Sequence, residues 1–403
     1  MTDLKPQSGP RSDAAAAPLS PARESALLWA LLLGNFVVGT GILLPAGMLT
    51  DLAQGLSVSV PAAGGLLLAS GIVVAIGAPL IAAITSNADR RLLLVASLVL
   101  YAIAHAVSAL ASSFEIVMAA RLALAISAAI FTPQAAATVG ALLTPERRSS
   151  AITFVFVGWS LATVGGMPLG GYVAHAFGWP LAFAIVAVMS VLAAVAVYLT
   201  VPRGVRIAPL SLASWKRVLT SNALMTVLLV TILNGTGQFT LFTYLSPSLK
   251  SSLSADAALV TLILAWYGIA ATLGNVVATR LVTNIGPARS ALVALLGMAS
   301  GLGLWGLGAH MLFAVLVAAT LWGLGTFATN SIQQARLAGL APELTSASIA
   351  LNTSAIYFGQ AAGSGLGGAL INAGAMPWLP WAGAAILLIA AAVSAFAMRY
   401  EAP

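Results

Sequence analysis

Uniformly apolar runs, separated by short polar breaks, cover most of the chain. The runs predict helices at residues 26–49, 61–84, 92–111, 115–142, 150–173, 180–200, 221–246, 257–280, 290–308, 311–335, 345–372 and 377–398. A helix needs about 20 apolar residues to cross the hydrocarbon core of a bilayer, and the runs have that length. Strands of a membrane β-barrel are about ten residues long and alternate in polarity, so the pattern indicates helices. The sequence therefore predicts an all-α membrane protein with twelve transmembrane helices.

The polar segments divide the chain into regions. Residues 1–25 are rich in Pro, Ala and Ser, which predicts a disordered tail. Residues 201–219 form a polar break that predicts a linker between a bundle at 26–200 and a second bundle at 220–398, followed by a short tail at 399–403. No apolar core with a small-residue cleavage site begins the chain, so we expect the first apolar run to be an uncleaved targeting signal.

The composition supports the membrane assignment. Hydrophobic residues make up 60% of the chain and charged residues 7%, whereas a soluble domain usually carries about 25% charged residues. So few charges cannot cover a water-facing surface, and most of the surface must face lipid. The chain contains no Cys, which excludes a disulfide framework and a Cys-based metal site.

The formal charge of +7 has a topological explanation. If the N-terminus is cytoplasmic, 15 of the 17 Lys and Arg residues fall on the cytoplasmic side, including Arg336 after the tenth span. Lys250 alone falls on the other side, and Arg121 alone falls inside a span. Positive charge collects on cytoplasmic loops, so the sequence predicts cytoplasmic N- and C-termini. The basic residues form no patch or basic helix, and we therefore expect no nucleic-acid partner.

The second half of the chain repeats features of the first at an offset of 196 or 197 residues. The repeated features are short motifs that contain Gly or Pro and occur in the same order. They pair Gly39-Thr40-Gly41 with Gly235-Thr236-Gly237, Gly77 with Gly274, Pro145-Glu146 with Pro342-Glu343, and Gly166–Gly171 with Gly363–Gly368. The repeat predicts two pseudo-symmetric six-helix bundles. Two such halves, with a site between them near the bilayer midplane, are a recurring design of secondary transporters.

Several motifs in order resemble the major facilitator superfamily, and more narrowly its bacterial drug:proton antiporter branch. The segment from Gly77 to Asp89-Arg90-Arg91 is similar to the family's loop motif between helices 2 and 3, without the usual acidic residue before the basic pair. Arg121 matches the buried arginine of helix 4. The segment from Gly158 to Gly171 resembles the helix 5 motif of exporters. Gln238, Phe239 and the residues up to Tyr244 resemble helix 7 of purine-nucleoside exporters.

Arg121 is a candidate for substrate binding. A charge inside a span costs about 2.5–3.5 kcal/mol on insertion scales, so it normally faces a cavity or a partner. Arg121 could anchor an anionic or carbonyl-rich substrate, or it could tune a nearby proton carrier. Because it lies near the outer end of its span, it could instead extend its head group to the membrane surface.

Amides and aromatic residues supply the other candidates for the substrate site. Asn234 and Gln238 are four residues apart and share a helix face that should point inward, either lining a cavity or hydrogen-bonding another helix. Phe242 continues this face and could stack on a planar ligand. Each of the remaining candidates, taken alone, is more typical of packing: Asn35, Gln134, Trp322, Asn330, Tyr357 and Gln360.

Titratable groups for proton coupling are scarce. All ten acids fall in tails, loops or span ends, whereas proton antiport needs a titrating group within reach of the site. The candidates are Asp51 and Glu115 at the outer mouth and His105 in helix 3, because histidine titrates near neutrality when unperturbed. No histidines and carboxylates share a helix face, so the sequence predicts no metal site.

Two motifs are expected to pack helices or gate the pathway. Gly77, Asp89, Arg90 and Arg91 form the first, in the loop after helix 2. The second, in helix 5, combines small residues that let helices approach closely with a proline that kinks the helix: Gly166, Pro168, Gly170 and Gly171.

The resemblance implies an inner-membrane exporter that moves a small organic solute, such as a nucleoside, a sugar or a drug, by alternating access and proton antiport. We expect a monomer, because each chain holds both halves of the pathway. A facilitator or importer of the same fold without proton coupling is the alternative, and the missing buried acid favours it. A membrane-embedded enzyme or a sensor is the third possibility. It lacks support because the sequence has no nucleophile–base pair, no P-loop and no added soluble domain. We expect no cofactor.

Overall fold

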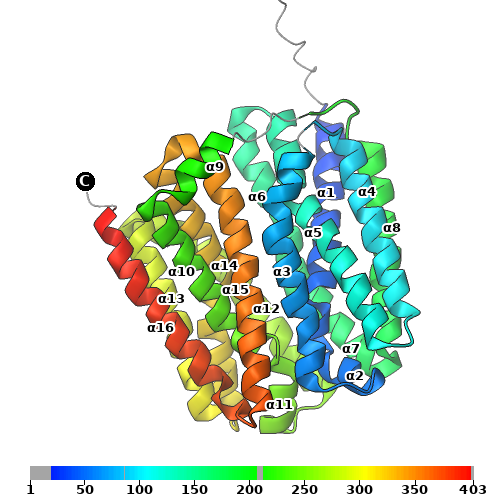
Figure 1. The fold of residues 1–403 in the computed structure, drawn as a ribbon, viewed down its shortest axis with the longest axis vertical. Helices are drawn as coiled ribbons and strands as arrows, with labels where there is room; N and C mark the ends of the chain where they lie inside the picture. Colours follow the sequence, from blue (N-terminus) through cyan, green and yellow to red (C-terminus); the bar gives the residue numbers. More distant parts are fainter. Residues whose placement is uncertain (1–19, 86, 207–211, 401–403) are drawn as a thin grey trace, which may run out of the picture.

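The computed structural model describes residues 20–85, 87–206 and 212–400. Tail residues such as Lys5 and Arg11 lie outside the described residues. The described residues form two helical halves that lie side by side, with the N-terminal half on the right in Figure 1 and the C-terminal half on the left. Nearly all of the chain in both halves is helical.

The N-terminal half contains six long helical segments, the fifth of which is broken. Its elements are α1 (Pro21–Gly47), the short α2 (Leu49–Gly55), α3 (Val60–Ile84), α4 (Arg90–Ala109), α5 (Phe114–Leu142), α6 (Pro145–Leu161), a π-helical turn (Ala162–Gly166), α7 (Met167–Phe177) and α8 (Trp179–Thr200).

The C-terminal half has the same plan. After α9 (Leu212–Leu219) come α10 (Asn222–Phe242), the short α11 (Leu245–Leu253), α12 (Ala257–Ile285), α13 (Pro287–Gly308), α14 (Leu312–Leu340), α15 (Thr345–Asn372) and α16 (Leu379–Ala397). Short 3-10 turns lie at Pro342–Leu344, Met376–Trp378 and Met398–Tyr400. We call the end at which α1 begins and α16 ends the proximal end, and the end that carries α2 and α11 the distal end (Figure 1).

The predicted all-α fold of two six-helix bundles is confirmed. Within the described residues, eleven helices are long and apolar enough to cross a membrane. The twelfth long helix, α15, has the predicted bounds but does not meet that measure of apolarity. It packs between α3 and α10, so its polar side chains need not face lipid. The exact division of the chain into domains at 26–200 and 220–398 stays a prediction.

Two features at the proximal end differ from the predictions. Helix α1 begins at Pro21, so residues 21–25 belong to a helix, and Glu24 is buried in its first turn. Arg336, which the sequence placed in a loop after the tenth span, lies inside α14 and is 1% exposed. Its guanidinium donates to Ser394 Oγ on α16 at 2.9 Å and to Gln333 Oε1 at 3.1 Å. These partners compensate the charge inside the bundle, so α14 can continue past it.

Short polar residues and glycines set the helix boundaries at the loops. The side chains of Ser59 and Asp256 cap α3 and α12 by accepting hydrogen bonds from backbone N–H groups three residues ahead, as N-cap residues do. Gly178 and Gly286 join α7 to α8 and α12 to α13 with φ values of 91° and 79°. Only glycine adopts such angles without strain, so each can turn the chain between two antiparallel helices in a single residue.

Glycines pack α7 against α1, as the sequence motif predicts. A Cβ atom at Gly171 would lie 2.6 Å from the carbonyl oxygen of Gly47, and one at Gly170 would collide with Leu44. Gly166 leaves space for Thr40 in the same way. A π-helical turn ends where α7 begins, and Pro168 lies in the first turn of α7, where its missing N–H breaks the helical pattern.

The C-terminal half repeats this packing at equivalent positions. A Cβ atom at Gly363 would lie 2.5 Å from the carbonyl oxygen of Thr236, and one at Gly367 would lie 2.5 Å from the carbonyl oxygen of Thr240. Here α15 takes the place of α7, and α10 takes the place of α1. The structure thus shows in space the repeat that the sequence shows at an offset of 196 or 197 residues.

The two halves meet closely along α3 and α15. A Cβ atom at Gly71 would lie 2.8 Å from the carbonyl oxygen of Tyr357 and 3.0 Å from the Cβ atom of Ala361. On the other side of the molecule, Gly268 of α12 rests on the π-helical turn, where its Cβ would lie 2.7 Å from the carbonyl oxygen of Thr163. Only small residues allow helices of the two halves to approach so closely.

Candidate functional site

Helix α10 presents a polar face to α14 inside the C-terminal half. Asn234, Gln238 and Phe242 lie one turn apart on this face and all three are buried. The Asn234 amide nitrogen donates to Thr329 Oγ1 of α14 at 3.0 Å. The Asn234 Oδ1 atom has no hydrogen-bond partner among the described residues. The side chain therefore uses its donor to hold two helices together and leaves its acceptor unused.

Aromatic rings continue the polar face toward the distal end. The Phe242 ring lies 5.5 Å from Tyr267 of α12 and 6.2 Å from Trp322 of α14, measured between centroids. Tyr267 and Trp322 are 4.6 Å apart, and Trp305 of α13 packs edge-on against Trp322 at 6.2 Å. Aromatic pairs at these distances stabilise each other. Trp322 is fully buried, yet its Nε1–H has no partner within the described part of the chain.

A network of amides lies on the proximal side of this face. The Asn330 Oδ1 atom accepts hydrogen bonds from Asn352 Nδ2 at 3.1 Å and from Gln334 Nε2 at 3.2 Å. The Asn352 Oδ1 atom accepts from the hydroxyl of Thr231 at 2.8 Å. The network joins α10, α14 and α15, and the two donors occupy both lone pairs of the Asn330 oxygen.

Tyr357 and Gln360 lie apart from this group, where α15 meets α3. Gln360 Nε2 donates to the carbonyl oxygen of Leu67 in the other half at 3.4 Å. The backbone of Tyr357 lies against Gly71, and its side chain is partly buried. Both residues therefore belong to the joint between the halves.

Arg121 is fully enclosed in the N-terminal half. Its Nη1 donates to the carbonyl oxygen of Gly41 at 2.6 Å, its Nη2 to that of Ile42, and its Nε to Ser70 Oγ at 2.8 Å. The side chain is 1% exposed, so the possibility that it extends to the membrane surface is wrong. Its guanidinium joins α5 to α1 and α3 instead.

Asn35 and Gln134 are buried in the same half. Asn35 Nδ2 donates to the carbonyl oxygen of Val155 on α6 at 3.3 Å, and its Oδ1 accepts from the hydroxyl of Thr132 on α5 at 2.9 Å. Asn35 thus joins three helices, as the packing interpretation predicts. Gln134 lies on α5, 6% exposed.

His105 packs on α1 beside the arginine. Its Nδ1 lies 3.0 Å from the carbonyl oxygen of Tyr101. Because a carbonyl can only accept, Nδ1 carries a proton, and in the neutral ring Nε2 is then the unprotonated nitrogen. Nε2 has no partner among the described residues and faces Gly41, whose Cβ, if present, would lie 2.6 Å away. His105 is therefore a buried base with a free lone pair, and its ring also packs against Tyr101 at 4.5 Å.

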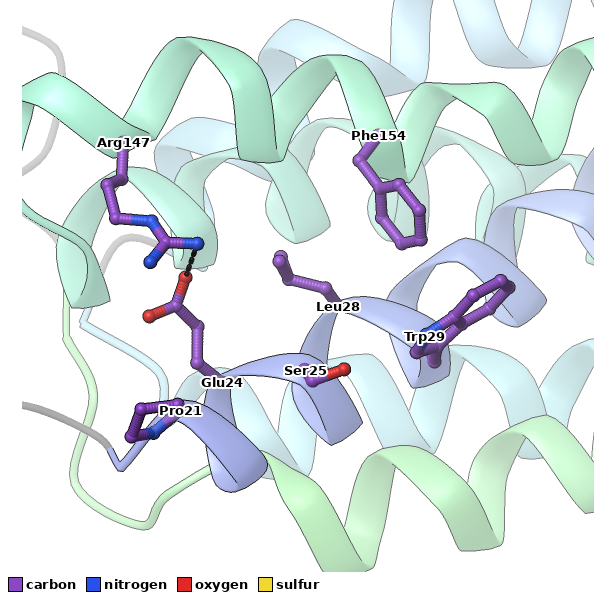
Figure 2. A pocket seen from close by; sticks show the side chains of 7 residues that line it. All are labelled: Pro21, Glu24, Ser25, Leu28, Trp29, Arg147 and Phe154. Atoms are coloured by element: carbon purple, nitrogen blue, oxygen red, sulfur yellow. Dashed lines mark ion pairs between the residues drawn. The ribbon is translucent and has the colours of Figure 1, made fainter.

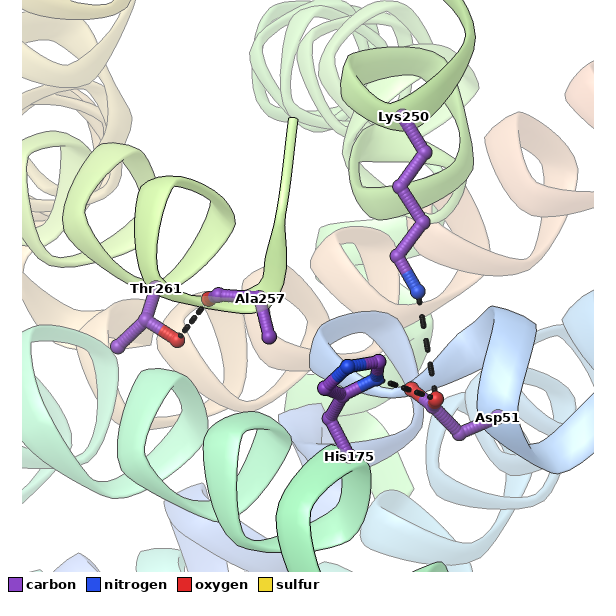
Figure 3. Close-up of polar contacts among 5 residues, drawn as sticks. All are labelled: Asp51, His175, Lys250, Ala257 and Thr261. Carbon is purple, nitrogen blue, oxygen red and sulfur yellow. Dashed lines mark hydrogen bonds and ion pairs between the residues drawn. The ribbon is translucent and has the colours of Figure 1, made fainter. Parts of the chain in front are cut away.

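Asp51 lies at the distal end, where it meets both halves (Figure 3). Its Oδ1 is 3.1 Å from His175 Nδ1 at the end of α7 and 4.0 Å from Lys250 Nζ on α11. Asp51 and Lys250 belong to different halves, and we call this pair the distal latch. Glu115, the other acid predicted near this end, is exposed at the start of α5.

The loop motif after α3 holds elements of one half together. Asp89 caps α4 through Leu92 N at 3.2 Å, and its second oxygen accepts from Gly204 N at 2.5 Å. Arg90 N donates to the carbonyl oxygen of Val205 at 3.0 Å. Arg91 lies 4.0 Å from the centre of the Tyr198 ring. The motif thus fastens α4 to the end of α8 and the segment after it, all within the N-terminal half.

Gly77 and its counterpart Gly274 differ. A Cβ atom at Gly77 would make an ordinary contact of 3.5 Å with Ala129 of α5. One at Gly274 would collide with the backbone of Leu324 on α14. The repeat therefore places both glycines at the same type of helix crossing, but only the second crossing requires a glycine.

Sequence reasoning missed several residues that the structure brings into these groups. Tyr267 and Trp305 complete the aromatic cluster, Ser70 supports Arg121, and Lys250 completes the distal latch. Ser70 and the aromatic residues carry no signal of their own in a chain rich in such residues. Lys250 did carry one, because it is the only basic residue that the topology places on the distal side.

Comparisons with known proteins agree with this architecture. The model of the Major Facilitator Superfamily matches residues 31–249 and 227–403. The inner membrane transport protein YdhP of Escherichia coli O157:H7 is 30% identical over 349 residues, which cover 86% of this chain and 89% of that protein. A probable sugar efflux transporter of Pasteurella multocida is 26% identical over 362 residues, 90% of this chain and 89% of the relative.

Among solved structures, a bacterial homolog of the human lysosomal transporter Spinster, in an inward-facing and unoccupied conformation, has a TM-score of 0.74 to this chain. The two share 18% identity, and the match covers 95% of this chain and 98% of the homolog. At this identity the likeness concerns the fold alone.

Proposed function

The chain belongs to the major facilitator superfamily, and from this premise we propose that it exports a small organic solute across the bacterial inner membrane by alternating access. The names of its relatives, an inner membrane transport protein and a probable sugar efflux transporter, support this direction and location. Basic residues gather at the proximal end, which supports cytoplasmic termini. Lys250, by contrast, is on the distal side.

The observation that carries the proposal is that two buried polar atoms on neighbouring helices α10 and α14 have no partner among the described residues. Asn234 offers a free acceptor and Trp322 offers a free donor, both buried. Unpaired buried polar groups are costly unless a ligand or water satisfies them. Thr329, which holds Asn234, and Trp322 are seven residues apart on α14, so the two groups are separated by about 10 Å along the helix.

This spacing fits a solute that has hydrogen-bonding groups at both ends and a planar or apolar body between them. Gln238 lies between Asn234 and Phe242 on the same face of α10, and Phe242 supplies a ring surface near the Trp322 end. A nucleoside, a sugar or an amphenicol-type drug has these properties. We place the substrate site on this wall of the C-terminal half, with Asn330 supporting it from the amide network.

Arg121 has a different role in this proposal. Three of its donors are occupied by α1 and α3, so it fixes the position of α1 in the N-terminal half. His105 is our candidate for the proton carrier, because its free Nε2 lies beside the same turn of α1. Asp51 acts in the distal latch, which must break when the halves separate at that end.

Facilitated diffusion or import without proton coupling remains the second candidate. Within the described residues every carboxylate lies in a loop, a short helix or the first turn of a helix. Many proton-coupled transporters place an acid deep in the membrane. Among the residues that the structure describes, His105 is our candidate for that role.

Inside-out vesicles energised with a pH gradient test the proposal. Nucleosides, sugars and amphenicol-type drugs are added in turn while the internal pH is followed. Dissipation of the gradient by one compound, only in vesicles that contain the protein, would establish antiport and identify the substrate. If a compound binds in a thermal-shift screen but none moves protons, proton coupling is wrong and the facilitator is correct. Loss of the proton response, but not of binding, in His105→Gln would support the assigned carrier.

A further inference from the structure

A pocket of about 230 Å³ opens between α1 and α6 at the proximal end (Figure 2). Glu24, Leu28 and Trp29 of α1 form one wall, and Arg147 and Phe154 of α6 form the other. The pocket exists because α1 begins at Pro21 and carries Glu24 into the bundle. It is separate from the substrate wall in the C-terminal half.

The two charges in this pocket have different surroundings. The Glu24 side chain is 12% exposed, whereas that of Arg147 is 65% exposed. Arg147 Nη2 approaches Glu24 Oε1 to 3.0 Å, but the contact does not have the angles of a hydrogen bond. An ion pair with one long, exposed partner is weak and easily exchanged. The Glu24 carboxylate is therefore buried and fixed in position, whereas the Arg147 guanidinium can move out into solvent.

The rest of the pocket is aromatic and apolar. Trp29 and Phe154 meet edge to face, with ring centroids 5.0 Å apart and planes at 89°. Trp29 is 58% exposed although it is a large apolar residue, and Leu28 packs on the core beneath it. Aromatic faces attract cations, tryptophan most strongly. A carboxylate beside two aromatic rings is the arrangement that recognises an ammonium group on an apolar body.

We propose that this pocket binds an organic ammonium ion with an apolar body. The ammonium replaces Arg147 at the Glu24 carboxylate, Arg147 turns out to solvent, and the body lies against Trp29 and Phe154. This inference goes beyond the proposed function, because binding here requires neither export nor proton coupling. It also changes the expected range of ligands. The sequence placed Glu24 in a polar tail and so offered no buried acid as a counter-charge for a cation.

Two sources could supply this chemistry: a free organic cation from the cytoplasm, or the ethanolamine head group of a phospholipid. Both carry an ammonium group; in the lipid a phosphate and glycerol separate it from the acyl chains. The pocket lies beside the first turn of α1, which begins at the proximal end (Figure 1), where water and lipid head groups meet the protein.

Titration calorimetry with benzyltrimethylammonium tests the proposal on the purified full-length protein in detergent without added lipid. We expect saturable binding that Glu24→Gln weakens at least tenfold and that Arg147→Ala leaves unchanged or strengthens, since Arg147 competes with the ligand. Opposite effects of the two partners would not arise from a merely structural ion pair. Benzyl alcohol, which has the ring without the charge, should not bind.

The matched control is the ion pair of the other half. Arg217 Nη2 lies 2.8 Å from Glu343 Oε1, also at the proximal end, but both side chains are more than half exposed. Glu343→Gln should leave binding of the probe unchanged. Should Glu24→Gln fail to fold, Trp29→Leu is the second variant, with binding weakened several-fold by loss of the ring.

The proposal is wrong if the wild-type protein does not bind the probe, if Glu24→Gln binds normally, or if Arg147→Ala weakens binding as much as Glu24→Gln. Nanodiscs then separate the two sources. If the probe binds more weakly in phosphatidylethanolamine than in a neutral glycolipid, and this difference between the lipids disappears in Glu24→Gln, the lipid head group is the occupant. Equal binding in both lipids identifies a free cation. Neither result depends on transport, so failure of the export proposal would be recognised separately.

Discussion

Arg121 donates a hydrogen bond of 2.6 Å to the carbonyl oxygen of Gly41, which lies four residues before Pro45 in α1. In an α-helix the N–H four residues ahead would bond to it. In α1 that residue is Pro45, which has no N–H. The guanidinium on α5 thus replaces a hydrogen bond that the proline removes from α1. This explains a buried charge without a substrate: the arginine satisfies the backbone of a neighbouring helix.

Replacing Arg121 should therefore lower stability and not transport alone. In Arg121→Met the Gly41 carbonyl would be buried without a donor, at a cost of about 1–3 kcal/mol in the free energy of unfolding. Thermal unfolding of the purified protein measures the loss. The effect should shrink in Arg121→Met combined with Pro45→Ala, because alanine at this position restores the missing N–H. The coupling free energy between the two changes should reach about 1 kcal/mol. Strictly additive effects would disprove the idea that Arg121 supplies the hydrogen bond that Pro45 cannot.

Closure of the halves at Gly71 and Ala361 can be locked by a disulfide. A Cβ atom at Gly71 would lie 3.0 Å from that of Ala361, close to the separation of about 3.5–4.5 Å in disulfides. The chain has no native Cys, so the pair Gly71→Cys and Ala361→Cys is unique. Because a Cβ at Gly71 would also lie 2.8 Å from the carbonyl oxygen of Tyr357, the two helices must move slightly apart to admit the cysteine. Oxidation should stop the transport that the reduced double variant retains, and reduction should restore it. Each single variant under oxidant is the control, and transport by the fully cross-linked protein would show that the halves need not part here.

Gly171 should tolerate no side chain. Gly171→Ala would press a methyl group against the carbonyl oxygen of Gly47, and overpacking of this kind costs about 1–3 kcal/mol. Gly165, six residues earlier, is the control, because a Cβ atom there would have no other atom within 4 Å. Gly165→Ala should change stability by less than about 0.5 kcal/mol. The melting temperatures of the two variants provide the comparison, and equal values would refute the packing role of the motif.

Two buried glutamines should respond differently to the same change. Gln238 lies on the substrate wall, whereas Gln333 joins helices, donating to the carbonyl oxygen of Val227 at 3.3 Å and accepting from Arg336. Gln238→Ala should alter the Michaelis constants for different substrates by severalfold and leave the melting temperature almost unchanged. Gln333→Ala should lower the melting temperature by the loss of about 1–3 kcal/mol. Unchanged kinetics for every substrate in Gln238→Ala would remove it from the site.

The stabilisation by Asp89 should depend on pH. Partial burial alone would raise the pKa of Asp89, but the N–H groups of Gly204, Leu92 and Arg91 and the Arg91 charge hold it below its ordinary value. A carboxyl with a lowered pKa in the folded state stabilises the protein above its unfolded pKa of about 3.9, and this is lost as the pH falls through the folded pKa. Asp89→Asn should thus be destabilising at neutral pH and less so below about pH 4. A difference in melting temperature that does not vary with pH would contradict this.

The sequence predicted the helices well because length and apolarity decide them. Eleven spans are apolar enough by themselves, and α15, which was predicted from its apolar run at 345–372, has the predicted length and bounds. Glu24 and Arg336 were placed outside the helices because their side chains are charged. A charged residue near a predicted span end reads as loop, whereas the structure buries both and gives each an ionic or polar partner on a neighbouring helix.

Polar residues within spans were harder to interpret. The pattern shows that Asn234, Asn330 and Asn35 must face inward, but it cannot show which partners they find. In the structure Asn35 and Asn330 are occupied by other helices, and only Asn234 keeps a free acceptor. Contacts between distant segments determine this difference, and spacing along one helix carries no information about them.

The contact of Gly268 with the π-helical turn gives the fifth transmembrane segment the form of a lever with unequal arms. From this fulcrum α6 extends 17 residues toward the proximal end and α7 extends 11 residues toward the distal end. At about 1.5 Å per residue, the arms measure about 26 Å and about 17 Å. Rotation about the contact would convert each ångström of parting at the distal end into about 1.5 Å of travel at the proximal end. The short arm, α7, would move little and suits close packing of the halves at the distal end. The long arm, α6, would move further and suits a wide opening at the proximal end.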